Sequence, residues 1–417
     1  MNKHLPLYSN YISTRKITQS LCAPLIEEDY TTQVDWFVSP PKWHLAHTTW
    51  FFETFILIPN LKEYKVFDEK FSYLFNSYYL SKGDQLTKSE RGVLARPQLN
   101  KIMDYRKQVD LAIEQLLGSC SELEYSKLES LMHIGINHEQ QHQELLLMDI
   151  KYNYASSSFK PNYADSNLKF DTDILPQEFL KVDEGVYSVG FEGDEFHFDN
   201  EVPRHKQYVH DCHISNRLVT NKEYLGFITD GGYKDPLLWL SDGWDWKQKN
   251  NIKKPLYWNI NDNGCDYFTL HGLRELDPSA PVSHISFYEA NAFAKWAGYR
   301  LPTEFEWEVA CNNYSADDLE KANLLDNRFM ALPNTSAPQC IGNLWVWTES
   351  AYLPYPNYLQ DKGALGEYNG KFMVNQKVLR GGSFATQRSH IRATYRNFYH
   401  PESRWCFNGI RLAKNND

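Results

Sequence analysis

The chain has few cysteines and no two of them at close spacing, which is a first restriction on its chemistry. Its 417 residues include 7 cysteines, which are scattered and never arranged as CxxC. An odd number of cysteines at wide spacing indicates neither a disulfide framework nor a thiolate zinc site. We therefore expect reduced thiols and a cytoplasmic location, in keeping with an N-terminus that lacks the apolar core of a signal peptide.

Long basic runs and long apolar runs are also missing. The net charge is −10, from 43 Lys and Arg against 53 Asp and Glu. An acidic chain without a Lys- or Arg-rich stretch argues against nucleic acid as a partner. No uninterrupted apolar run reaches the roughly 20 residues that cross a bilayer, which argues against a membrane-spanning segment. No internal repeat is found either. Because the charge argues against nucleic acid, the expected partners are small molecules.

Aromatic and other hydrophobic residues, by contrast, are abundant. Hydrophobic residues make up 42% of the chain, with 12 Trp, 27 Tyr and 23 Phe. This is enough to fill more than one core, and the length favours two domains. Apolar residues recur at three- and four-residue spacing in four segments near the N-terminus, which predicts a four-helix bundle. These segments lie around residues 10–25, 40–58, 99–118 and 124–152.

The helical spacing of apolar residues ends after the fourth segment. We predict a helical domain over 1–152, a polar linker over 153–177 and an α+β domain over 178–417, in which Gly, Pro, Asn and Asp punctuate short segments. Within the last domain a helix is expected from Ser286 to Ala297, because Ser286 precedes a glutamate by three residues and so forms a capping box. A second helix is expected to begin near Thr303.

Two histidines on the fourth predicted helix have the spacing of metal ligands. His138 and His142 are four residues apart, so both imidazoles lie on one face of the helix. An HxxxH pair also arises by chance, on surfaces and in hydrogen-bonded cores. The pair therefore indicates a metal site only if a third ligand joins it.

The second predicted helix offers two more histidines, His44 and His47. His47 shares the apolar face of that helix with Trp43 and Trp50, so we expect it to be the inward one. A set of three neutral imidazoles suits iron, zinc, copper or nickel and leaves coordination positions open for substrate. Glu53 and Glu144 are candidates to accept a ring N–H from a ligand.

Several motifs together resemble a known family. Three segments of the helical region are similar to the iron-binding domain of the ergothioneine-pathway sulfoxide synthases, a DinB-like bundle. Others resemble the formylglycine-generating-enzyme-like domain, a variant of the C-type lectin fold. The helical segments are Pro41–Glu53, Leu74–Tyr79 and His138–Glu144, and the others include Val219–Tyr224, Arg300–Glu308, Gly342–Thr348 and Leu379–Ser383.

The resemblance implies a non-haem iron(II) enzyme with His47, His138 and His142 as ligands. It implies the joining of a cysteine sulfur to carbon 2 of the imidazole of hercynine, which is N-trimethylated histidine, with O2 as the oxidant and a sulfoxide as the product. Residue matching gives Gln141 and Asn397 as substrate-binding positions.

The proton donor and the thiol substrate differ between branches of this family. The branch that uses free cysteine resembles this chain at Tyr78 and Tyr79, which would be the catalytic tyrosines. The branch that uses γ-glutamylcysteine takes its tyrosine from the C-terminal domain, where Tyr352 is the candidate, and tends to have an acid where this chain has Tyr399. The tyrosine pair and the missing acid favour L-cysteine.

The charges of the implied substrates suggest further contacts. The trimethylammonium of hercynine is best held by aromatic faces, for which Phe398 and Tyr399 are candidates together with nearby tryptophans. The carboxylate of cysteine needs a cation, and Arg91 and Arg96 follow the tyrosine segment closely. Single arginines more often form surface ion pairs.

Other functions fit parts of the sequence. A formylglycine-generating oxidase needs a close cysteine pair near its C-terminus, where this chain has Cys406 alone. A lectin-like binding module would leave the three histidines unexplained. A thiol transferase on the same bundle would not need O2. The ovothiol branch, which joins sulfur to carbon 5 of histidine, usually adds a methyltransferase domain, and no glycine-rich cofactor fold is seen here. A selenium-transferring relative stays open.

Overall fold

The chain folds into two compact units. The computed structural model describes residues 5–165, 174–262, 264–311, 316–326, 328–335, 340–360, 362 and 366–416. The first unit is Met1–Tyr163 with Asp361–Tyr368, and the second is Ala164–Gln360 with Asn369–Asp417. The predicted linker 153–177 therefore lies partly outside the described residues.

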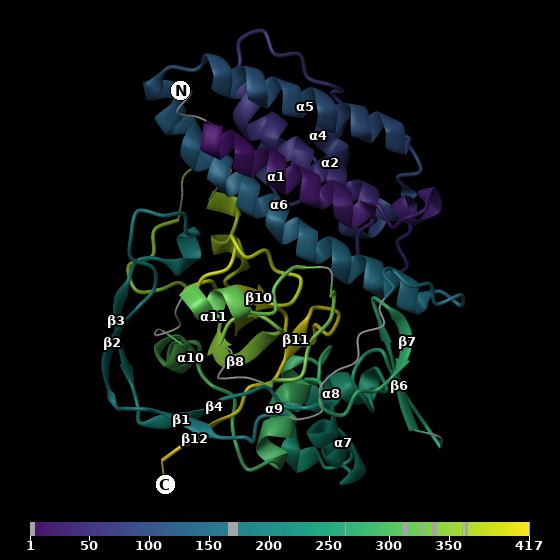
Figure 1. The fold of residues 1–417 in the computed structure, drawn as a ribbon, viewed down its shortest axis with the longest axis vertical. Helices are drawn as coiled ribbons and strands as arrows, with labels where there is room; N and C mark the ends of the chain where they lie inside the picture. The colour runs from purple at the N-terminus through teal and green to yellow at the C-terminus, as the bar shows by residue number, and fades with distance from the viewer. Residues whose placement is uncertain are drawn as a thin grey trace. The chain divides into compact units, whose positions relative to one another are not determined.

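Four long helices make up most of the first unit. They are α1 (Leu5–Cys22), α2 (Pro41–Phe52), α5 (Leu99–Ser119) and α6 (Glu122–Ser156). Helices α1 and α2 each pack against both α5 and α6, which closes a four-helix bundle and confirms the expected architecture (Figure 1). Short elements fill the connections. They are 3₁₀ turns at Glu27–Thr31, Leu80–Lys82 and Lys88–Val93, a π-helical turn at Glu53–Leu57, and helices α3 (Ile58–Asn60) and α4 (Phe71–Phe75).

Local signals explain where these helices begin. Pro41 occupies the first turn of α2, where its missing N–H costs no helical hydrogen bond. Ser121 caps α6 and forms a capping box with Glu124. Helix α6 approaches α2 closely at Gly135, where a Cβ atom would lie 2.5 Å from Cε1 of Phe52. The contact between the two helices that carry the histidines therefore needs glycine at this position.

A buried ion network ties three of the bundle helices together. Glu139 of α6 is fully buried and accepts hydrogen bonds from Arg15 of α1 at 2.9 Å and from Arg106 of α5 at 2.9 Å. The two guanidinium groups lower the pKa of Glu139 to about 2, against the effect of burial, which raises it. Removing one partner of such a network typically costs about 3–5 kcal/mol, because a buried charge is left uncompensated.

The second unit contains the mixed α+β structure expected from the sequence. Its sheets have the strand orders β1-β4-β12, β10-β9-β8-β11, β2-β3 and β5-β6-β7, and only β8 and β11 pair in parallel among the described strands. The strands are β1 (Phe179–Val182), β2 (Gly185–Val189), β3 (His205–Val209), β4 (Cys212–Ser215), β5 (Trp258–Asn261), β6 (Gly264–Thr269), β7 (Gly272–Glu275), β8 (Trp345–Ala351), β9 (Lys377–Arg380), β10 (Asn397–Tyr399), β11 (Asn408–Gly409) and β12 (Ala413–Asn415).

Helices and 3₁₀ turns complete this unit. The helices are α7 (Asn221–Thr229), α8 (Ser241–Lys249), α9 (Phe287–Trp296), α10 (Glu304–Cys311) and α11 (Ala316–Lys321), with 3₁₀ turns at Asp199–Glu201, Pro236–Leu238 and Gly370–Phe372. The capping box predicted at Ser286 opens α9, with Glu289 accepting from the Ser286 N–H at 2.8 Å. The helix expected near Thr303 is α10. Both predictions are confirmed.

Several buried charges of the second unit form ion pairs in its core. Glu304 at the start of α10 accepts hydrogen bonds from Arg380 at 2.9 Å and from Arg396 at 2.8 Å, and Glu308 accepts from Arg380 at 2.8 Å. These groups are buried, so the Arg-Leu-Pro-Thr-Glu-Phe-Glu segment has a structural role here.

The expectation of reduced thiols throughout is wrong for one pair of cysteines. Cys311, at the end of α10, forms a disulfide with Cys340, which is 29 residues later. Spacing along the chain does not reveal this pair, because the fold brings the two Cα atoms within 5.6 Å. No helix in the described part of the chain is long and apolar enough to cross a membrane.

Candidate metal centre

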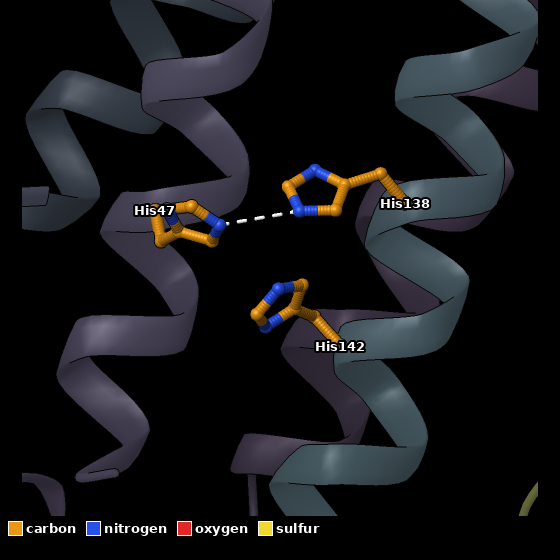
Figure 2. Close-up of side chains that lie close together, drawn as sticks. All are labelled: His47, His138 and His142. Atoms are coloured by element: carbon orange, nitrogen blue, oxygen red, sulfur yellow. Dashed lines mark hydrogen bonds between the residues drawn. The ribbon is translucent and has the colours of Figure 1, made fainter. Parts of the chain in front are cut away.

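Three histidines meet inside the helical unit. His47 of α2 faces His138 and His142 of α6, and one ring nitrogen of each lies within 4.8 Å of the others (Figure 2). All three side chains are buried. No other metal-binding cluster of this kind occurs among the residues that the structure describes. The grouping expected from the sequence is therefore present.

The spacing of the ring nitrogens fits a bound metal ion. Nε2 of His47 and Nε2 of His138 are 3.2 Å apart. Two nitrogens that each bind a metal at about 2.0–2.1 Å lie roughly 2.9–3.4 Å apart when the angle at the metal is about 90–109°. Two lone pairs facing each other at this distance would repel without a cation or a proton between them. The donor set thus suits a divalent transition metal.

Backbone structure decides which nitrogen His47 presents. Its Nδ1 lies 2.6 Å from the carbonyl oxygen of Phe75, at the end of α4. A carbonyl oxygen only accepts, so Nδ1 carries the proton and Nε2 keeps a lone pair that could bind a metal ion. The ring also stacks on Trp43, with centroids 4.4 Å apart and planes 11° from parallel. These contacts fix both the tautomer and the orientation of the ring.

Burial keeps the three imidazoles neutral. Desolvation lowers the pKa of His138 to about 3, although the nearby Glu139 raises it. The pKa values of His47 and His142 are lowered well below the usual value, first by burial and then by the neighbouring histidines. Only a neutral imidazole has a lone pair to offer, so each of the three rings could bind a metal ion at neutral pH.

These pKa values predict how the metal-free protein responds to acid. In the unfolded chain a histidine takes up a proton below about pH 6.5. In the folded chain the pKa of His138 is about 3, so the ring becomes protonated only near that pH. The free energy of unfolding therefore falls as the pH drops through this window, by about 1.4 kcal/mol per pH unit for each such histidine.

Urea unfolding of chelator-treated protein between about pH 6 and pH 4 measures this slope. We expect the His138→Leu variant to lose about 1.4 kcal/mol less per pH unit than the wild type, because one proton uptake is removed. Equal slopes for the two proteins would contradict the assignment of a neutral, buried imidazole to His138.

The predicted catalytic tyrosines lie in the same unit, after α4. Asn76 is fully buried and its side chain bonds to the backbone of Tyr79, at 3.3 Å from the N–H and 3.0 Å from the carbonyl, which shapes the turn. The hydroxyl groups of Tyr78 and Tyr79 are 3.5 Å apart. The Tyr79 ring packs against Trp50 and Phe55. Burial raises the pKa of both tyrosines, so their hydroxyls stay protonated at neutral pH.

A third tyrosine, which sequence reasoning did not find, joins this group. Tyr368 belongs to the segment Asp361–Tyr368 that the structure assigns to the helical unit. Its ring centroid is 5.7 Å from that of His138 and 6.2 Å from that of Tyr78, and its hydroxyl donates a hydrogen bond to Oε1 of Gln141. Nothing in the local sequence marks Tyr368, because its place depends on this distant segment joining the bundle.

A glutamate next to Tyr368 attaches this segment to the tyrosine turn. The Glu367 carboxylate accepts hydrogen bonds from the N–H of Leu80 at 3.0 Å, from the N–H of Ser81 at 3.1 Å and from the Ser81 hydroxyl at 2.6 Å. Hydrogen bonds to an ionised acceptor are among the stronger ones in proteins. Tyr368 and the Tyr78–Tyr79 turn are thus held together on one side of His138.

The two predicted arginines differ in their surroundings. Arg91 is buried, donates hydrogen bonds to Ser39 at 2.9 Å and to Ser77 at 3.0 Å, and lies 3.4 Å from the centroid of the Trp43 ring. Burial lowers its pKa to about 9. Arg96 is exposed. Of the two, Arg91 is the one beside the residues that surround the histidines.

The remaining predicted site residues belong to the second unit. Asn397, Phe398 and Tyr399 form β10, which pairs with β9. Phe398 stacks on Tyr352 with centroids 4.1 Å apart, and the Tyr352 hydroxyl accepts a hydrogen bond from Asn200 at 2.8 Å. Their proposed roles toward a substrate stay predictions.

Glu53, which the sequence suggested as a partner of a ligand, has another role. Its carboxylate accepts hydrogen bonds from Tyr64 at 2.7 Å, from Tyr105 at 2.6 Å and from the N–H of Phe67 at 3.1 Å. It therefore fastens the π-helical turn after α2 to its neighbours. That Glu144 accepts a ring N–H from one of the histidines stays a prediction.

Comparisons with known proteins match two parts of the chain to two different families. Residues 11–146 match the DinB superfamily, and residues 168–416 match the sulfatase-modifying factor enzyme 1-like domain. Hercynine oxygenase of Mycolicibacterium smegmatis is 30% identical over 67% of this chain and 70% of its own length, and so is that of Mycobacterium tuberculosis. Formylglycine-generating enzyme of Bos taurus is 24% identical over 57% of this chain and 75% of its own length.

Proposed function

Because the chain belongs to the hercynine oxygenase family and contains the sulfatase-modifying factor enzyme 1-like domain, we propose that it is an iron(II)- and O2-dependent enzyme that makes hercynylcysteine sulfoxide. The observation that carries this proposal is the buried set of His47, His138 and His142. In the proposed reaction a C–S bond joins cysteine to carbon 2 of the hercynine imidazole, and the sulfur is oxidised to the sulfoxide.

The proposed reaction balances with O2 as the only oxidant. Hercynine loses the hydrogen on carbon 2, cysteine loses its thiol hydrogen, and one oxygen atom is added to sulfur while the other leaves as water. C–S bond formation and sulfoxidation remove two electrons each, which together equal the four electrons that O2 accepts. Iron(II) held by three imidazoles would supply the redox chemistry and leave positions open beside the ligands.

The tyrosines supply the protein's part in proton transfer. Tyr78, Tyr79 and Tyr368 lie together on one side of His138. A buried, protonated hydroxyl there is a suitable proton donor to reduced oxygen. Tyr78 and Tyr79 are the proposed catalytic residues, and the position of Tyr368 next to His138 adds it as a third candidate. Tyr352 remains an alternative.

Substrate binding is proposed for the residues that the resemblance to the family implied. Gln141 follows His138 by less than one helical turn, and its side-chain amide can hydrogen-bond an imidazole. Arg91 would hold the carboxylate of cysteine, which its buried cationic group favours, and Arg96 is the second candidate. Asn397, Phe398 and Tyr399 are proposed to contact hercynine, the two aromatic rings through its trimethylammonium group.

L-cysteine is the proposed thiol donor. Support comes from the adjacent Tyr78 and Tyr79 and from Tyr399, which stands where the γ-glutamylcysteine branch tends to have an acid. The alternatives are γ-glutamylcysteine as donor, histidine as acceptor with sulfur at carbon 5, and a selenium donor. They differ in substrate and product, so one assay distinguishes them.

That assay combines O2 uptake with mass spectrometry of the products. Iron(II)-loaded protein is given hercynine or histidine together with cysteine, γ-glutamylcysteine or a selenium donor. We expect O2 uptake and hercynylcysteine sulfoxide from hercynine and cysteine. A product from histidine alone would indicate the ovothiol-type reaction. No O2 uptake with any pair would overturn the proposed chemistry.

A further inference from the structure

A chain of buried hydrogen bonds leads outward from one of the three histidines. Nδ1 of His142 lies 2.9 Å from Nδ1 of His44, and Nε2 of His44 lies 3.1 Å from Oδ2 of Asp149. The same carboxylate oxygen accepts the N–H of Ser39 at 2.8 Å. All four side chains are buried. Neither His44 nor Asp149 has a part in the proposed function above.

The chemistry of these groups determines the direction of each hydrogen bond. An ionised carboxylate only accepts, so Nε2 of His44 is the nitrogen that carries the proton. Nδ1 of a neutral His44 is then an acceptor, and the proton between the two Nδ1 atoms belongs to His142. His142 is left with a lone pair on Nε2, which is the nitrogen that a metal needs.

The three histidines differ in the hydrogen bond that Nδ1 makes. Nδ1 of His47 donates to a backbone carbonyl, which no substitution removes. Nδ1 of His138 is buried without a hydrogen-bond partner among the described residues. Only His142 has its tautomer controlled by side chains. Its contribution to metal binding is therefore the one that the sequence can adjust at positions outside the ligand set.

We propose that His44 and Asp149 are positioning residues that hold His142 in its Nδ1–H tautomer with Nε2 directed at the metal. This inference rests on the three-histidine metal site but not on the reaction assigned to it. The hydrogen bond also restrains rotation of the ring about its Cβ–Cγ bond, and an acceptor behind a ligating imidazole increases its basicity.

Two substitutions at one position separate this role from packing. His44→Leu removes the acceptor, whereas His44→Asn places a carbonyl oxygen close to where Nδ1 stood and restores it. His133→Asn, on α6 but outside the cluster, is the control. Cobalt(II) titration of the metal-free proteins without substrates gives the affinity and the ligand-field spectrum of the site, and circular dichroism reports folding.

We expect His44→Leu to weaken cobalt binding about 10–100-fold and to change the spectrum, with His44→Asn and His133→Asn within about threefold of wild type. Unchanged affinity in His44→Leu, or equal losses in His44→Leu and His44→Asn, would overturn the proposal. Because no substrate is present, a protein that binds cobalt normally but makes no sulfoxide would count against the proposed function alone.

If His44→Leu does not fold, the tautomers of His44 and His142 can still be measured in the wild-type protein. Nitrogen-15 spectra of histidine-labelled protein loaded with zinc(II), which is diamagnetic, report which ring nitrogen carries a proton. We expect protons on Nδ1 of His142 and on Nε2 of His44. The opposite tautomer at either ring would overturn the proposal.

Discussion

Replacing His138 by alanine is expected to abolish iron retention and sulfoxide formation together. The substitution removes one of the three proposed protein ligands, and no other metal-binding cluster is found among the described residues that could replace it. Loss of a partner behind a ligand typically costs about 10–100-fold in metal affinity, so loss of the ligand itself should cost more. Iron content after desalting, and product formation by the same sample, measure the two effects.

A second histidine of α6 provides the matched control for this experiment. His133 lies on the same helix but outside the three-histidine group, and His133→Ala should keep both iron and activity. Circular dichroism should show a folded protein in both variants. Wild-type iron content and full sulfoxide synthesis in His138→Ala would contradict the ligand assignment.

Replacing Tyr79 by phenylalanine should have the opposite pattern, in which iron is retained but sulfoxide is lost. The ring and its packing against Trp50 and Phe55 are preserved, and only the hydroxyl is removed. If this hydroxyl donates the proton, the rate of product formation falls about 10²–10⁴-fold, which is the usual contribution of general acid catalysis. Single-turnover product analysis with matched iron content measures it.

Two further variants test the neighbouring hydroxyls. Tyr78→Phe and Tyr368→Phe remove hydroxyl groups on the same side of His138 without changing the histidines. The donor is the tyrosine whose substitution causes the large loss. Unaffected turnover in Tyr79→Phe would move the role to Tyr78, Tyr368 or Tyr352, and iron loss in any of these variants would indicate a structural effect instead.

Regular spacing in the sequence was enough to predict the helical bundle and its ligand pair. The apolar repeat over 124–152 and the four-residue interval from His138 to His142 both follow from the geometry of a single helix, so no distant contact is needed to read them. The choice of His47 over His44 followed in the same way from its apolar neighbours. The structure confirms this grouping.

Features that depend on distant contacts were missed. The hydrogen bond between His44 and His142 joins residues 98 positions apart, and the one between Tyr368 and Gln141 joins residues 227 positions apart. The Cys311–Cys340 disulfide likewise appears only when α10 meets a later segment. In the sequence, none of these residues stands in a pattern that distinguishes it from an ordinary core or loop residue.

The sequence by itself determined the local structure: helix periodicity, caps such as that of Ser286, and the two histidines presented on one face of α6. Only the tertiary structure decided what stands around them, including the tautomer of His47 and the arrival of Tyr368 beside His138. The physical reason is the separation along the chain of the residues that interact. A helix turn is specified by residues three or four apart, whereas the environment of a ligand is specified by whichever distant side chains the packing of the whole unit brings within hydrogen-bond distance.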